Sequence, residues 1–171
     1  MPNKILRKLL IFTRNNGISE TFKLIGKNIK YEFRWFLDRA FDRLQGTDTS
    51  SRIELADLDI VGDNRSSGTY YEPTSTALFR HIINKLQSAL SYEDFMFLDY
   101  GSGKGRVLLL ASDYNFRSII GIEFSRELHL VAERNIALYR GRRQLFKEIT
   151  SILFDATVYP SPIRKSARLV L

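Results

Sequence analysis

The sequence predicts an α/β protein whose strands form a parallel sheet. Its second half alternates short apolar runs with segments of helical periodicity, which is typical of strands joined by helices. Three of the apolar runs end at or beside an acidic residue, namely Asp99, Glu123 and Asp155. A glycine-rich turn at 101–105 follows the first run. Ligands of open α/β sheets bind at the carboxyl ends of the strands, so these features predict a binding site there.

Four strands and two helices are expected in this half of the chain. The strands are predicted at 95–100, 117–122, 150–154 and 167–171. The helices are predicted at 105–114 and 125–140, because apolar residues recur there at three or four steps. Since a parallel sheet built in this way is normally buried on both sides, we expect both of its faces to be covered.

Residues 1–45 are predicted to form a basic helical extension. Apolar residues recur at helical spacing over 4–12 and 19–44, and Asn15-Asn16-Gly17 breaks the pattern between them. The segment holds ten of the 26 basic residues and four of the 19 acidic ones, so it carries +6 of the net charge of +7. Its apolar stripe consists of Phe22, Ile25, Ile29, Phe33, Phe36, Leu37, Ala40, Phe41 and Leu44.

This stripe needs a partner, and several partners fit the sequence. We expect it to pack on the domain or on a second copy of the chain, as in a homo-oligomer. A basic amphipathic helix also fits peripheral contact with a membrane or another anionic partner. Because no acidic residue precedes Glu20, an organelle-targeting presequence is a further alternative.

Residues 46–72 are predicted to form a connection rather than a core element. They are rich in Gly, Ser, Thr and Asp, and only 53–60 shows a short apolar alternation. Connections of this length often carry function, so we expect a lid or a substrate-gating loop. Pro73 then begins a predicted helix over 74–90. Its apolar face is expected to consist of Leu78, Ile82 and Leu86.

The composition excludes several classes of protein. The chain has no cysteine and only two, widely separated histidines, which excludes a disulfide framework and a thiolate zinc site and argues against any metal site. No apolar run approaches the ~18 residues of a membrane span, and the run at 9–12 is too short for a secretory signal. We therefore expect a cytoplasmic protein. Since the residues after 45 are nearly neutral, the charge distribution argues against a cationic nucleic-acid-binding surface over the whole protein.

The glycine-rich turn discriminates between ligand classes. A phosphate-binding P-loop needs Ser or Thr after Lys104, and a dinucleotide fingerprint needs a glycine at 106, but the sequence has Gly105 and Arg106. Asp99 precedes the first glycine, where it would repel a pyrophosphate but attract an ammonium group. Lys104 is interpreted as a solvated residue at the helix start, with contact to a ligand carboxylate as the alternative.

Together these motifs resemble the class I S-adenosylmethionine-dependent methyltransferases. The family's first motif is similar to FLDYGSGKGRVLLLA, its second strand and helix to IIGIEFSRELHLVAERNI, and its third strand to ILFDAT. The resemblance covers 95–155 and implies a Rossmann-like sheet with seven strands in the order 3-2-1-4-5-7-6. Residues 73–171 would supply its first four strands, so we expect a fragment of a longer protein, with a degenerate protein as the alternative.

The resemblance also implies which residues bind S-adenosylmethionine. Glu123 matches the acid that binds both ribose hydroxyls, and Asp155 matches the residue that contacts the adenine amine. From the residues alone, a carboxylate can accept from two adjacent hydroxyls, and Glu123 lies 22 positions after Gly101, close to the ~20 expected of a ribose-binding acid. A helix-capping Asp99 and ordinary strand-end acids at 123 and 155 are the alternatives. The predicted cofactor-binding set is Asp99, Gly101, Ser102, Gly103, Gly105, Glu123, Phe124, Asp155, Ala156, Tyr71 and Thr74.

Within this set, Tyr71 and Thr74 are included because the region before the first strand often closes over the methionine end of the cofactor in the family. The implied activity is methyl transfer to a small molecule, a protein or an RNA. The Glu-Leu-His and Ala-x-x-Asn spacing in the helix over 125–140 is similar to that of lysine-directed protein methyltransferases. No catalytic base is assigned, and His129 and Asn135 are interpreted as helix-face residues. A non-catalytic interaction protein is the alternative function, and the glycine spacing disfavours a nicotinamide oxidoreductase.

Overall fold

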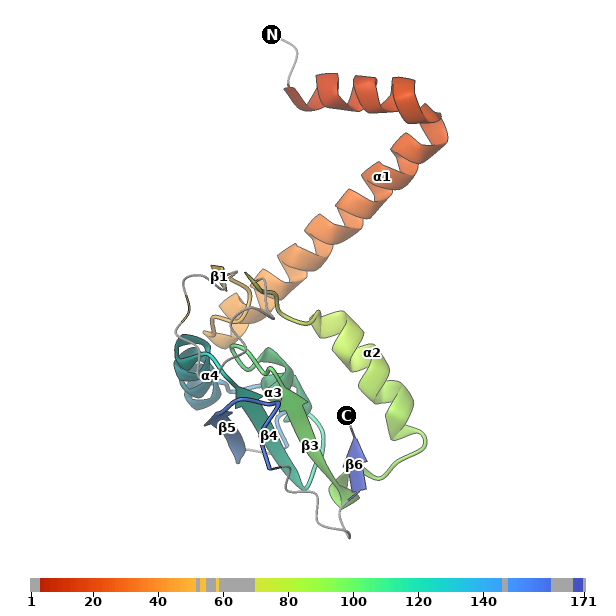
Figure 1. Ribbon diagram of the computed structural model, residues 1–171. Coiled ribbons are helices and arrows are strands. Elements are labelled where there is room, and N and C mark those ends of the chain that lie inside the picture. Colours follow the sequence, from red (N-terminus) through yellow and green to blue (C-terminus); the bar gives the residue numbers. More distant parts are fainter. Residues whose placement is uncertain are drawn as a thin grey trace. The chain divides into compact units, whose positions relative to one another are not determined.

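The computed structural model describes residues 4–51, 53–54, 58, 70–145, 148–160 and 168–170 (Figure 1). The chain divides into two compact units, residues 1–37 and residues 38–171. Helix α1 (Lys4–Gln45) contributes to both units. The larger unit contains the predicted strands and the glycine-rich turn.

Helix α1 is interrupted at the predicted position. Gly17 has φ 84° and ψ 165°, a conformation that L side chains rarely adopt, so the helical hydrogen-bond pattern is kinked there. The hydroxyl of Thr21 donates to the carbonyl of Gly17 at 2.9 Å and steadies the turn that follows. The break predicted at 15–17 is therefore confirmed at Gly17, although the two helical segments adjoin without an intervening loop.

The larger unit is built around a parallel sheet in the order β5-β4-β3-β6. Its strands are β3 (Phe95–Tyr100), β4 (Ser118–Glu123), β5 (Ile149–Leu153) and β6 (Arg168–Val170). Strand β3 pairs with β4 on one side, with Asp99 opposite Gly121, and with β6 on the other. The prediction of an α/β fold with a parallel sheet is confirmed, and each predicted strand lies within a few residues of an observed one.

Connections across this sheet explain where its helices lie. Helices α3 (Arg106–Ala111) and α4 (Arg126–Leu138) follow β3 and β4, and both crossovers run in the same direction along the sheet. Right-handed connections therefore place both helices on the same face. The direction reverses between β5 and β6, and residues 161–167 of that connection lie outside the described ranges. In the part of the chain that the structure describes, the helices that link β3 to β4 and β4 to β5 therefore lie on one face, and the expectation that both faces are covered stays a prediction.

Helix α2 (Thr76–Gln87) buries only part of the predicted face, because Leu86 packs against the core but Leu78 and Ile82 do not. Phe79 and Ile83 are buried, whereas Leu78 and Ile82 are about half exposed. The helix begins at Thr76 because its N–H and hydroxyl both donate to Asp38 Oδ1, at 3.3 Å and 3.1 Å. That anchor turns Phe79 toward the sheet, where its ring meets Phe97 edge-on at 5.9 Å. A short 3₁₀ turn, η3 (Tyr92–Asp94), then leads into β3.

The ends of the connection over 46–72 are held together by two short strands. Strand β1 (Ile53–Glu54) pairs antiparallel with β2 (Tyr70–Tyr71), and Ile53 lies opposite Tyr71. The predicted lid falls mainly on residues outside the described ranges. Among the helices that are described, none is both long enough and apolar enough to cross a membrane.

Candidate functional site

The turn between β3 and α3 has a backbone that glycine makes possible. Gly101, Gly103 and Gly105 have φ values of 75°, 54° and 83°, all in the left-handed region. The N–H groups of Gly101 and Ser102 donate to the carbonyl of Ile122 at 2.8 Å and 3.0 Å. The turn is therefore fastened to the carboxyl end of β4, the strand that carries Glu123.

Tyr71 lies directly on this turn. A Cβ placed on Gly103 would come within 2.3 Å of the Tyr71 ring. The Tyr71 hydroxyl donates to the carbonyl of Thr49 at 2.9 Å, and burial raises its pKa. The structure thus brings Tyr71 to the predicted site. Thr74, by contrast, is exposed, and the described residues include no hydrogen-bond partner for it.

Asp99 and Glu123 lie near the carboxyl ends of neighbouring strands. Burial, together with the nearby Glu123 carboxylate, raises the pKa of Asp99 to about 7. Asp99 has no hydrogen-bond or ion-pair partner among the residues that the structure describes. Two close carboxylates without a cation favour either a proton or a positively charged ligand between them.

Glu123 is held in one orientation by main-chain donors. Its Oε2 accepts from the N–H of Gly103 at 2.7 Å, and its Oε1 accepts from the N–H of Ser125 at 2.8 Å. The side chain is buried, and burial raises its pKa while these two hydrogen bonds lower it. Each carboxylate oxygen keeps a further acceptor position. Glu123 therefore offers a fixed pair of acceptors beside the glycine turn.

The third predicted acid follows the adjacent strand β5. The N–H of Phe154 donates to the carbonyl of Glu123 at 2.8 Å, which joins the ends of the two strands. Asp155 Oδ1 accepts from the N–H and the hydroxyl of Thr157 at 2.9 Å and 2.7 Å. The three strand ends are neighbours, as predicted, but one oxygen of Asp155 closes its own turn. Of the remaining predicted residues, Ser102 is buried, and Phe124 and Ala156 are partly buried.

The interpretation of Lys104 as a solvated residue is wrong. Lys104 is buried, its Nζ lies 3.1 Å from Asp48 Oδ2, and it donates to the hydroxyl of Ser51. Burial alone would raise the pKa of Asp48, but the hydrogen bond from Ser51 and the nearby ammonium hold it below its ordinary value. Lys104 therefore links the start of the 46–72 connection to the glycine turn, and Asp48 neutralises its charge.

Asn135 completes this fastening from α4. Its side-chain N–H₂ donates to the carbonyls of Asp48 and Lys104, both at 2.9 Å, and its oxygen accepts from the N–H of Asp48 at 2.9 Å. The side chain is fully buried. Asn135 thus links α4 to the start of the 46–72 connection and to the glycine turn. Its position in the sequence of the helix did not predict this role.

Arg106 forms a second buried network that the sequence reasoning missed. Its guanidinium lies 3.1 Å from Asp38 and 3.7 Å from Asp42, and its Nε donates to the Thr49 hydroxyl at 2.7 Å. Phe41 lies against the same guanidinium, 5.9 Å from ring centroid to Cζ. Two signals were present in the sequence: a charged residue opening the run RVLLLA, and two acids four positions apart on α1.

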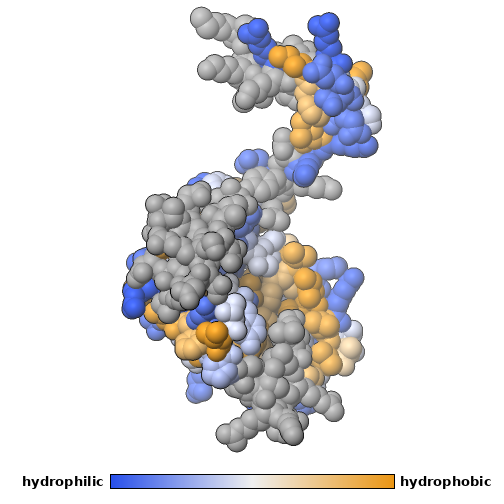
Figure 2. Space-filling model, viewed as in Figure 1, coloured by the Kyte–Doolittle hydropathy of each residue, from blue (hydrophilic) through white to orange (hydrophobic). Residues whose placement is uncertain are grey.

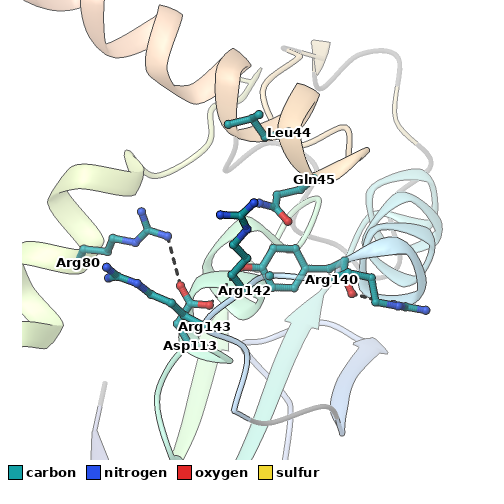
Figure 3. Close-up of a pocket in the computed structure, with 9 residues that line it drawn as sticks. Leu44, Gln45, Arg80, Asp113, Arg140, Arg142 and Arg143 are labelled. Carbon is teal, nitrogen blue, oxygen red and sulfur yellow. Dashed lines mark hydrogen bonds and ion pairs between the residues drawn. The ribbon is translucent and has the colours of Figure 1, made fainter.

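A cavity of about 480 Å³ lies elsewhere, at the carboxyl ends of α3 and α4 (Figure 3). Arg80 pairs with Asp113 at 3.2 Å, and Arg140 donates to the carbonyls of Ala137 and Tyr139, both at 2.7 Å. These helices begin at the carboxyl ends of strands, so the cavity lies toward the opposite edge of the sheet from the glycine turn. None of the predicted site residues lines it. Its lining comprises Leu44, Gln45, Arg80, Asp113, Tyr139, Arg140, Gly141, Arg142 and Arg143.

The chain was compared with protein-family models and with curated proteins. No protein-family model matches this chain, and no curated protein matches it either. The geometry around the glycine turn is therefore the feature that points to a function.

Replacing Gly103 with alanine is expected to loosen Tyr71 from the turn. The new Cβ would meet the Tyr71 ring at 2.3 Å in a backbone of positive φ, so the free energy of unfolding should fall by about 2–3 kcal/mol. Denaturant unfolding would measure this loss. Gly101→Ala is the matched control, because its φ is also positive but its Cβ would meet nothing within 4 Å. Equal losses in the two variants would contradict the role assigned to Tyr71.

Proposed function

We propose that the glycine turn binds S-adenosylmethionine and that this chain is part of a methyltransferase. The observation that carries the proposal is the arrangement of Asp99 and Glu123 at adjacent strand ends around the turn. The strand order β5-β4-β3-β6 supports it, because it equals the order 3-2-1-4 of the first four strands in the family that the motifs resemble.

The chemistry of these side chains fits the cofactor. S-adenosylmethionine carries an ammonium group, a sulfonium and a ribose diol, but no phosphate. Asp99, which lacks a partner among the described residues, is suited to the ammonium group. The fixed carboxylate of Glu123 is suited to the two ribose hydroxyls, and Gly101 leaves open space where a side chain would stand.

The role of the chain's own residues in this proposal is to bind and to orient. When bound, S-adenosylmethionine supplies an electrophilic methyl group. The main-chain hydrogen bonds to Glu123, together with Tyr71 on Gly103, hold the binding residues in place before the ligand arrives. Such positioning is the main contribution a protein makes to the direct transfer of a group between two bound molecules. The methyl acceptor is a small molecule, a protein or an RNA.

Calorimetric titration of the full chain with S-adenosylmethionine and with NADH tests the proposal. We expect heat of binding with S-adenosylmethionine only. Glu123→Gln should weaken that binding by about 1–3 kcal/mol, because it removes the negative charge from the buried acceptor of the two proposed ribose hydrogen bonds.

Glu133→Gln is the matched control for this titration, since Glu133 lies on the exposed face of α4 and should leave affinity unchanged. Thermal unfolding of both variants would separate a lost ligand contact from a lost fold. Binding of NADH, or unaltered affinity in folded Glu123→Gln, would contradict the assignment.

A further inference from the structure

The smaller unit presents a continuous apolar face on α1. Five large side chains of this face are between 62% and 69% exposed. After the Gly17 break they recur at intervals of three, four or seven positions, so they share one side of the helix. Soluble monomers rarely leave an apolar patch of this extent without a partner. The face comprises Ile18, Phe22, Ile29, Phe33 and Phe36.

The same unit holds nearly all of the protein's excess charge. Residues 1–37 contain eight Lys and Arg residues and two Glu residues, which gives +6 of the total +7. Lys23 and Lys27 are exposed, one turn apart, and Lys23 also pairs with Glu20 at 2.6 Å. Hydrophilic and hydrophobic residues lie side by side on this part of the molecule (Figure 2). Basic residues beside an apolar face suit a partner that offers both negative charge and apolar groups.

We propose that residues 18–36 bind an anionic membrane surface, with the helix in the plane of the interface. The apolar face would enter the boundary between headgroups and acyl chains, and the lysines would remain among anionic headgroups. Because this helix is not apolar enough to span a bilayer, a position at the surface is the arrangement that satisfies both of its sides.

A second copy of the chain fits this face less well than a membrane does. In a two-stranded coiled coil, Phe22, Ile29 and Phe36 would occupy one core position of the heptad. If they occupy position a, position d holds Ile18, Ile25 and Glu32, and Phe33 stays in water. If they occupy position d, position a holds Ser19, Gly26 and Phe33, and Ile18 stays outside the seam. Either register therefore puts polar residues or glycine in the seam and leaves part of the apolar face uncovered, whereas a membrane can accommodate the broader face.

Vesicle flotation of the full chain tests this proposal directly. We expect the protein to float with vesicles of phosphatidylcholine mixed with phosphatidylserine, and to bind pure phosphatidylcholine at least tenfold more weakly. Raising the salt concentration should reduce binding to the mixed vesicles.

Two pairs of substitutions separate the apolar and the electrostatic contributions. Phe22→Ser with Phe33→Ser should reduce affinity for the mixed vesicles at least tenfold. Lys23→Gln with Lys27→Gln should reduce it by about fivefold for each lysine, with little effect on pure phosphatidylcholine.

Leu78→Ser with Ile82→Ser is the matched control, because these are half-exposed apolar residues on α2 of the larger unit and should not affect flotation. Three results would overturn the proposal. The first is that the protein does not float with the mixed vesicles, and the second is that the control variant and the Phe22→Ser, Phe33→Ser variant bind them equally. The third is that light scattering gives a dimeric mass for a wild-type protein that binds no vesicles, and that Phe22→Ser with Phe33→Ser abolishes this dimer. Because S-adenosylmethionine binding involves other residues, each of these results leaves the proposed function to be judged on its own titration.

Discussion

Asp99→Asn is expected to stabilise the fold above pH 7 and, at the same time, to weaken binding of S-adenosylmethionine. In the folded protein, burial and the neighbouring Glu123 raise the pKa of Asp99 to about 7, well above the value of a carboxyl in the unfolded chain. Above pH 7 the folded state must therefore hold a charge that the unfolded state hydrates more easily. Removing that charge should increase the free energy of unfolding by about 1–2 kcal/mol.

The pH dependence of this effect has a defined sign. Between about pH 4 and pH 7 the folded state keeps the Asp99 proton while the unfolded state releases it, so the wild-type protein loses stability as pH rises through this range. The gain in free energy of unfolding caused by Asp99→Asn should therefore reach its full size above pH 7 and vanish near pH 4. Chemical unfolding of both proteins at pH 5 and pH 8 would measure the difference. A variant less stable than the wild type at pH 8 would contradict this account.

Ligand binding should change in the opposite direction. The ionised carboxyl is the form that attracts an ammonium group, so wild-type affinity for S-adenosylmethionine should fall as pH drops below about 7. Asp99→Asn should bind about ten- to a hundredfold more weakly at pH 8 and should lose most of that pH dependence. Calorimetry in buffers of different ionisation enthalpy would also detect proton release on wild-type binding. A purely structural Asp99 would affect stability alone.

Arg106→Met is expected to cause the largest loss of stability. The guanidinium is fully buried and forms ion pairs with the Asp38 and Asp42 carboxylates, and its Nε donates the one hydrogen bond that it makes to a described residue, Thr49. Methionine fills a similar volume but leaves two acids on the last turns of α1 without their cation. Breaking a buried ion network in this way costs about 3–5 kcal/mol.

Arg80→Met provides the comparison for this prediction. Arg80 also pairs with an aspartate, the buried Asp113, but the Arg80 side chain is 41% exposed and Tyr139 also donates to Asp113, so its loss should cost less than the loss of Arg106, about 1–2 kcal/mol. Urea denaturation followed by circular dichroism would give both values. Similar losses in the two variants would show that burial of the Arg106 network adds nothing. Arg106→Lys should recover only part of the loss, since an ammonium cannot reach both acids and Thr49 together.

The sheet was predictable because its signals are local. Each strand is a short apolar run, and the glycines of the turn mark the positions where the backbone must adopt positive φ. The placement of Asp99 and Glu123 near neighbouring strand ends follows directly from the alternation of strands and helices. Tyr71 was a weaker inference, and its contact with Gly103 depends on the pairing of β1 with β2.

The buried charges could not be inferred in the same way. Lys104 resembles a solvated residue in sequence because its partners, Asp48 and Ser51, are more than fifty residues earlier. Arg106 likewise meets Asp38 and Asp42 only after the chain has folded. The choice of Leu78 and Ile82 as a buried face failed because helical spacing defines a stripe without defining which stripe faces the sheet.

The buried network at the end of α1 limits how the protein can be shortened. A shortened form beginning at Asp38 keeps Phe41 and both acids that neutralise Arg106, while it removes the whole of the smaller unit. A form beginning at Gly46 would leave the buried Arg106 guanidinium without either acid, and we expect it to misfold. We therefore expect that the N-terminal segment can be removed or replaced only upstream of Asp38.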